Sequence, residues 1–125
     1  MEFKIDTRDN YVLIETLGDH LSVNMAAMLE ERASKLADTG SQNFLINLES
    51  CQTADGAAFE ALAVWHETNY SEGRSLVFTG MQRAVLDTVK EAQMDGAINI
   101  APTEQEAIDI INMEILEREL FNEEG

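Results

Sequence analysis

Short apolar runs alternate along the chain with longer stretches in which apolar residues recur every three or four positions. Residues 2–16 predict a β-hairpin, because two such runs flank the turn-forming segment Arg8-Asp9-Asn10. Three more apolar runs are too short for helices and predict strands at 44–48, 76–78 and 97–100. Strand-like runs are therefore spread over most of the sequence.

Two helices are predicted between these strands, each with a start and a stop signal. Ser22 or Asn24 can cap the first helix, and Gly40 supplies the residue that ends it. Asp55 stands at the N-cap position of the second helix, which Gly73 ends. Both stretches keep apolar residues on one face, as expected of helices that pack on a sheet.

Two further helices are predicted in the last third of the chain. One runs from about residue 81 to residue 93. Pro102 and Thr103 open the other, because proline fits the first turn and a threonine hydroxyl caps free backbone amides. The apolar face of this helix ends near Glu117, so residues 118–125 are expected to form a frayed acidic tail.

The predicted order of elements is β-β-α-β-α-β-α-β-α, with a loop over 49–54. Strands that alternate with helices need crossover connections, which favour parallel pairing. The sequence therefore predicts a single α/β domain over 1–117, with a mixed, mostly parallel sheet of about five strands and four helices, followed by a tail over 118–125. A chain of 125 residues, of which 45% are apolar, is large enough for one well-formed core.

The chain carries 24 acidic and 8 basic residues, which gives a net charge of −16. This charge disfavours nucleic acids and anionic membrane surfaces, because both bind chiefly through lysine and arginine. It either steers a basic protein partner or only keeps the domain in solution. No apolar run reaches the roughly 18 residues of a membrane helix, and the first residues do not resemble a secretory signal. We therefore expect a cytoplasmic protein without membrane insertion.

Few residues of the chain indicate chemistry. Cys51 is the single cysteine, which excludes an internal disulfide and a zinc cluster. His20 and His66 are the best general-base candidates, but neither stands at metal-ligand spacing from another histidine or cysteine. Trp65 and Tyr70 either pack beneath a helix or anchor a partner. The sequence predicts no catalytic residue, no metal ligand and no cofactor, and hence no enzyme.

Three stretches of the chain resemble a known family. They are the segment Leu17-Gly18-Asp19-His20-Leu21, the run Phe44-Leu45-Ile46-Asn47-Leu48 that leads to Asp55, and the run Leu76-Val77-Phe78-Thr79-Gly80-Met81. In order and spacing, residues 2–115 resemble the STAS domain of bacterial anti-sigma-factor antagonists. The resemblance implies a regulatory protein-interaction domain that acts in signalling and in the regulation of transcription.

The family carries Asp-Ser-Ser-Gly-Leu at the start of the helix in which its members are phosphorylated. Here Asp55 keeps the aspartate, while Gly56 and Ala57 take the places of the two serines. Ala57 has no oxygen that could accept a phosphoryl group, so the resemblance predicts a protein without this switch. Thr53 and Ser50 remain as alternative acceptors upstream.

The resemblance also implies a docking surface and a class of partner. The expected surface combines the start of the second helix with the preceding strand-end loop: Asp55, Gly56, Ala57, Ala58, Asp19, His20 and Leu21. The expected partner is an anti-sigma-factor kinase-like protein. Alternatives are a non-catalytic subunit of a larger signalling or transporter-associated complex, and a sensor of nucleotides or small ligands. The oligomeric state stays open.

Overall fold

The computed structural model describes residues 3–124 of the chain. The strands are β1 (Phe3–Thr7), β2 (Val12–Thr16), β3 (His20–Leu21), β4 (Asn43–Asn47), β5 (Thr53–Ala54), β6 (Ser75–Thr79) and β7 (Asn99–Ala101). The helices are α1 (Val23–Asp38), α2 (Gly56–Ser71), α3 (Arg83–Glu91) and α4 (Glu104–Glu124).

Five strands form the main sheet in the order β1-β2-β4-β6-β7. Only β1 and β2 pair antiparallel, and the other neighbours pair parallel. The register aligns one apolar residue from each strand in a row across the whole sheet: Ile5, Ile14, Ile46, Phe78 and Ile100. The predicted fold class, a mixed and mostly parallel sheet of five strands with four helices, is confirmed.

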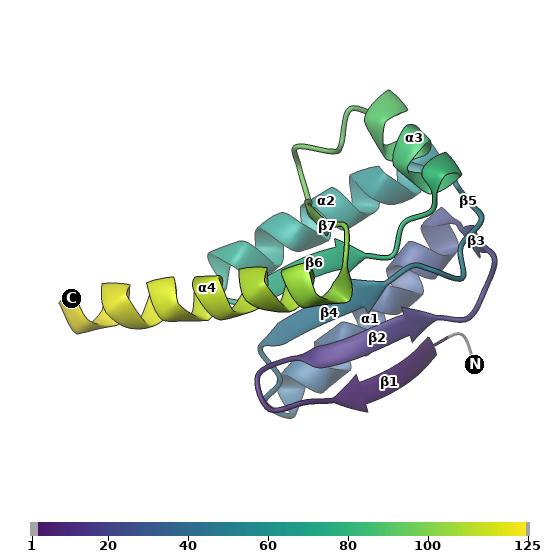
Figure 1. Ribbon diagram of the computed structural model, residues 1–125. Helices are drawn as coiled ribbons and strands as arrows, with labels where there is room; N and C mark the ends of the chain where they lie inside the picture. The colour runs from purple at the N-terminus through teal and green to yellow at the C-terminus, as the bar shows by residue number, and fades with distance from the viewer. Residues whose placement is uncertain (1–2, 125) are drawn as a thin grey trace.

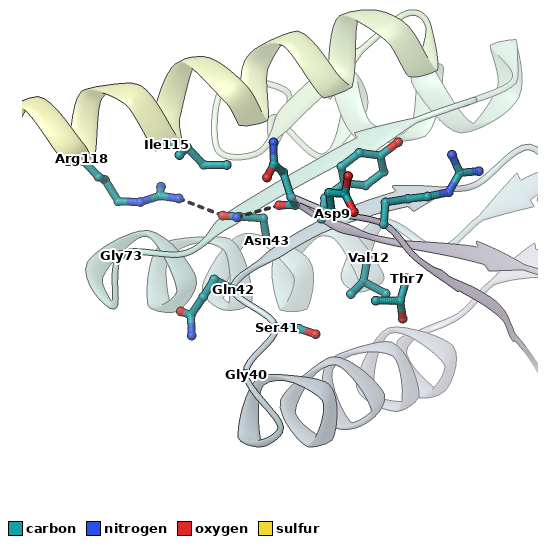
Figure 2. Close-up of a pocket in the computed structure, with 13 residues that line it drawn as sticks. Thr7, Asp9, Val12, Gly40, Ser41, Gln42, Asn43, Gly73, Ile115 and Arg118 are labelled. Carbon is teal, nitrogen blue, oxygen red and sulfur yellow. Dashed lines mark hydrogen bonds between the residues drawn. The ribbon is translucent and has the colours of Figure 1, made fainter.

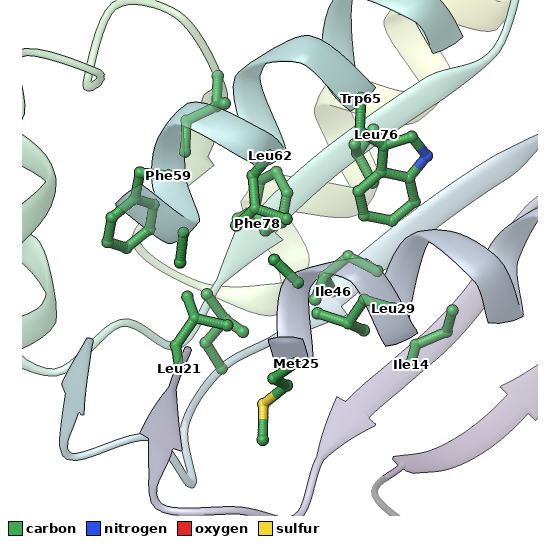
Figure 3. Packing of buried hydrophobic residues seen from close by; sticks show 14 of the residues in the cluster. Ile14, Leu21, Met25, Leu29, Ile46, Phe59, Leu62, Trp65, Leu76 and Phe78 are labelled. Carbon is green, nitrogen blue, oxygen red and sulfur yellow. The ribbon is translucent and has the colours of Figure 1, made fainter. Parts of the chain in front are cut away.

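Helices cover the sheet on both faces (Figure 1). α1 and α2 lie on one face, where the larger core forms, and Val85 and Val89 of α3 join that core. Figure 3 shows Leu62 and Trp65 of α2 packed over the sheet. Trp65 is 5% exposed and meets the ring of Phe78 edge to face at 6.4 Å, so it packs in the core.

Within residues 3–124, α4 alone packs against the other face of the sheet and forms a second, smaller core. Ala107 and Ile111 of α4 are fully buried there, against Leu13, Leu45 and Val77 of three neighbouring strands. These three strand residues lie side by side in the sheet register. Strands in the middle of the sheet are therefore apolar on both faces, as expected where helices cover both sides.

The helix boundaries follow the capping residues that the sequence predicts. The Ser22 hydroxyl accepts a hydrogen bond from the Met25 amide at 3.1 Å, and the Thr103 hydroxyl accepts one from the Glu106 amide at 3.1 Å. Gly73 follows α2 with a φ of +75°, a conformation that glycine adopts without strain.

The segment 49–54, predicted as a loop, contains a short strand. β5 pairs parallel with β3 in a separate two-stranded sheet, in which His20 faces Thr53 and Leu21 faces Ala54. Two-residue strands carry no recognisable periodicity, and their pairing joins segments more than thirty residues apart in the sequence. The prediction of an unpaired loop was therefore wrong at Thr53 and Ala54.

The last helix does not fray after Glu117, as the sequence analysis expected, but continues to Glu124. Arg118 holds this part of α4 against the sheet. Its guanidinium donates to the Asn43 side-chain oxygen at 2.8 Å and to the Ser75 hydroxyl at 3.1 Å. Among helices within residues 3–124, none has the length and apolar character needed to cross a bilayer.

Candidate functional site

The start of α2 lies at the carboxyl ends of the parallel strands, where β4 passes through a short loop into α2. Two contacts fix the beginning of this loop. The Leu48 amide donates to the Thr79 carbonyl at 2.9 Å, and the Glu49 amide donates to the Asn47 side-chain oxygen at 2.8 Å. The carboxyl edge of parallel strands is where α/β proteins most often place binding groups.

The pair β3–β5 brings the strand-end loop of residues 19–21 beside the start of α2. The Gln52 amide donates to the Asp19 carbonyl at 2.7 Å, and the Asp55 amide donates to the Leu21 carbonyl at 2.9 Å. The two segments that the sequence analysis assigned to one surface are therefore neighbours in space. Their role in binding stays a prediction.

His20 connects β3 to β5 and to the start of α2 through both ring nitrogens. Nδ1 lies 2.7 Å from the Thr53 hydroxyl, and Nε2 lies 3.1 Å from a carboxylate oxygen of Asp55. The Asp55 carboxylate is turned toward His20 and, within the described part of the chain, forms no capping hydrogen bond with α2. The first amides of α2 are thus left without the side-chain acceptor that an aspartate at this position usually supplies.

The residues of the predicted docking surface differ in solvent exposure. Asp19, His20, Asp55 and Ala57 are exposed, and Gly56 is half-buried. Leu21 and Ala58 are fully buried. These two cannot offer side chains to a partner and support the surface from beneath. We call the remaining five residues the α2 N-terminal surface: Asp19, His20, Asp55, Gly56 and Ala57.

The hydroxyl groups near this surface are held by hydrogen bonds. The Thr53 hydroxyl is exposed and bound to His20. The Ser50 hydroxyl donates to the Gly18 carbonyl at 2.7 Å and lies 2.8 Å from the Thr16 hydroxyl. Of the two alternative acceptors, Thr53 is therefore the more accessible.

The other candidate residues occupy different environments. Cys51 is fully buried, with its Sγ 3.6 Å from the Thr16 hydroxyl and 3.7 Å from the Gly18 carbonyl oxygen. His66 is half-buried on α2, and Tyr70 is 65% exposed near its end. Over residues 3–124, histidine, cysteine and acidic side chains do not gather into any group of three or more that could hold a metal ion.

A hollow of about 480 Å³ lies at the opposite end of the sheet, between the β1–β2 turn, the α1–β4 turn and α4 (Figure 2). Part of its polar lining is engaged within the protein. Arg118 binds Asn43, whose side-chain amide donates to the Asn10 carbonyl at 2.9 Å. Arg8 pairs with Asp6 at 2.8 Å, a hydrogen bond that raises the pKa of Arg8. Sequence reasoning missed the contacts of Asn43 with Arg118 and Asn10, because they join residues far apart in the chain.

The sequence matches the model of the STAS domain family over residues 2–107. No curated protein matches the sequence.

Solved structures share the fold at low sequence identity. An anti-sigma factor antagonist from Mycobacterium paratuberculosis is 14% identical, with a TM-score of 0.72 over 88% of this chain and 92% of that chain. A chain of the stressosome, described as a signal integration and transduction hub, is 16% identical, with a TM-score of 0.63 over 87% of this chain and 96% of its own. The murine anion transporter Slc26a9 is 12% identical, with a TM-score of 0.66 over 86% of this chain and 18% of the transporter.

Proposed function

Because the chain belongs to the STAS domain family, we propose that it is a regulatory, non-enzymatic domain that binds a protein partner through the α2 N-terminal surface. The observation that carries the proposal is the β3–β5 pairing, which joins two segments distant in sequence into one exposed and fixed surface. In this function the chain acts as a cytoplasmic anti-sigma-factor antagonist that regulates transcription.

The chemistry of the surface fits a protein partner. Gly56 and Ala57 are small, so the backbone of a partner can approach the free amides of the first turn of α2. Hydrogen bonds that join His20 to Thr53 and Asp55 hold these side chains in place before binding, which lowers the entropic cost of association. A preformed surface of this kind suits docking.

The charge of the chain defines the partner further. A net charge of −16 attracts a protein with a basic docking face and repels phosphate backbones. An anti-sigma-factor kinase-like protein with lysine or arginine around its docking site is the partner that we propose.

Binding at this surface is not switched by phosphorylation in our proposal. Ala57, where family members carry the acceptor serine, is exposed but has no hydroxyl. We expect no phosphate on residues 55–59 after incubation with ATP and the anti-sigma-factor kinase of the same organism, read by mass spectrometry. Phosphate on Thr53 would overturn the unswitched mechanism while leaving the docking surface in place.

The surface is tested by Ala57→Glu, with Ala27→Glu as the matched control. Both alanines are exposed on helices, but Ala27 lies on α1, outside the proposed surface. Titration calorimetry with the same kinase should show at least a tenfold weaker affinity for Ala57→Glu, because the new carboxylate loses its hydration where the interface closes. Equal affinities for the two variants would refute the surface.

A second candidate function is a subunit of a larger signalling complex. The likeness to a chain of the stressosome, which this domain matches over most of its length, favours this function. Gel filtration of a native cell extract distinguishes the two. A stable complex of high mass supports the subunit role, and elution near 13.9 kDa, the mass of the chain, contradicts it.

A further inference from the structure

The two halves of α4 meet different surroundings. In the first half, Ala107 and Ile111 are fully buried against the sheet. Further along the helix, Met113 is 61% exposed, Leu116 is 54% exposed and Leu120 is 52% exposed. Figure 1 shows this end of α4 extending past the edge of the sheet. These three apolar side chains are therefore more than half exposed within the described part of the chain.

The exposed residues share one side of the helix. Met113, Leu116 and Leu120 follow the spacing i, i+3, i+7, which places them in a single stripe. We call these three residues the outer α4 stripe. Phe121, which is 78% exposed, stands beside its end and borders a hollow of about 440 Å³ next to Gly73.

Arg118 sets the direction in which the stripe points. It is two residues from Leu116 and two from Leu120, a rotation of about 200° in each case, so it lies on the opposite side of the helix. Because Arg118 is bound to Asn43 and Ser75 on the sheet, the stripe must face away from the sheet. Rotation of α4 to bury the stripe would break both hydrogen bonds.

The run of exposed apolar side chains along one side of α4 is typical of a contact site. Met113, Leu116 and Leu120, each more than half exposed, follow one another along one side of about two turns of helix. Contiguous apolar surfaces of roughly 300–600 Å² on a small domain are commonly interaction sites. An amphipathic helix of a partner can pack its own apolar ridge against such a stripe.

The charges around the outer α4 stripe indicate which kind of partner binds it. Asp109, Glu117 and Glu119 are exposed on the same part of α4. Arg118 is the only basic residue of Glu104–Glu124, and it is engaged with the sheet. A second copy of the chain would bring like charges together, with a net charge of −16 on each copy.

We propose that the outer α4 stripe binds a basic amphipathic helix of a partner protein. Leucine-type side chains of that helix cover Met113, Leu116 and Leu120, and its lysine or arginine residues meet the surrounding carboxylates. The site is separate from the α2 N-terminal surface. The second half of α4 lies beside Gly73, at the far end of α2, and a 16-residue helix is about 24 Å long. Both surfaces can be occupied at once.

The test uses a synthetic helical peptide with leucine along one face and lysine elsewhere. Its control is a peptide of the same composition in scrambled order, which keeps the charge and loses the apolar face. Fluorescence anisotropy should show binding of the amphipathic peptide at least tenfold tighter than binding of the scrambled one. Equal binding of the two peptides, or no binding of either, would overturn the proposal.

Variants of the protein locate the contact. The double variant Leu116→Ser and Leu120→Ser should weaken peptide binding at least tenfold. The control pair Val64→Ser and Tyr70→Ser should leave it unchanged, because these residues are at least as exposed but lie on α2. All four positions are on the surface, so circular dichroism should show the same fold. Sedimentation that reveals a dimer, dissolved by the Leu116 and Leu120 changes, would overturn the proposal in favour of a second copy.

Discussion

Replacement of Gly80 by alanine is expected to destabilise the protein by about 2–3 kcal/mol. Gly80 lies between β6 and α3 and contacts the loop that leads from β4 to α2. Gly80 has a φ of +76°, and an alanine in this region costs about 1 kcal/mol. The added methyl carbon would lie 2.5 Å from the side-chain oxygen of Asn47. That oxygen must move away and give up the hydrogen bond from the Glu49 amide, which adds about 1–2 kcal/mol.

Gly73→Ala is the matched control. Gly73 has nearly the same φ, +75°, but the atom nearest to its added methyl group is a side-chain carbon of Arg118 at 3.8 Å. This variant should therefore lose only the backbone contribution of about 1 kcal/mol. Urea unfolding followed by far-ultraviolet circular dichroism measures both free energies. Equal losses for Gly73→Ala and Gly80→Ala would refute the steric argument.

A double-variant cycle with Asn47→Ala assigns the steric contribution. If the displaced Asn47 side chain is its source, Gly80→Ala should cost less in the Asn47→Ala background than in the native protein. The cost should then approach that of Gly73→Ala. An unchanged cost would place the strain elsewhere, at the Glu49 amide, which would lie 3.2 Å from the new methyl group.

Three further variants test other parts of the structure. Leu62→Ala should lower the free energy of unfolding in urea by about 2–5 kcal/mol, because Leu62 is 1% exposed. Val64→Ala on the same helix, where the residue is 68% exposed, should change it by no more than about 0.5 kcal/mol. Similar losses for the two variants would contradict the burial of Leu62. Arg118→Met should speed amide hydrogen exchange in the last turns of α4, because it removes both hydrogen bonds to the sheet; unchanged exchange would show that other contacts hold this end. His20→Ala should lower the free energy of unfolding by about 0.5–1 kcal/mol, because it removes the hydrogen bonds with Thr53 and Asp55. The β3–β5 pair should then open more often, seen as faster hydrogen exchange of the Asp55 amide. Unchanged protection of that amide would contradict the bridging role of His20.

The parts of the fold that the sequence predicted rest on local signals. Ser22 and Gly73 mark helix ends through their own backbone and side-chain chemistry, and short apolar runs identify the parallel strands. The burial of Leu21 next to the exposed His20 follows the alternation of a strand, but a two-residue strand has no periodicity from which to predict it.

The parts that could not be predicted depend on partners far away in the sequence. Asp55 was read as a helix cap, but its carboxylate contacts His20, 35 residues earlier. The end of α4 was read as a tail, but Arg118 contacts Asn43, 75 residues earlier. A local pattern of acidic residues contains no information about such contacts. The docking roles of the two surfaces remain predictions.

The buried position of Cys51 gives the protein an internal reporter. Cys51 is the single cysteine of the chain and is fully buried beneath the segment that leads to α2. A thiol reagent in solution can reach it only when this segment opens, so the labelling rate measures the frequency of that opening. A bound partner that clamps the segment would slow labelling, and urea would make the thiol react at once.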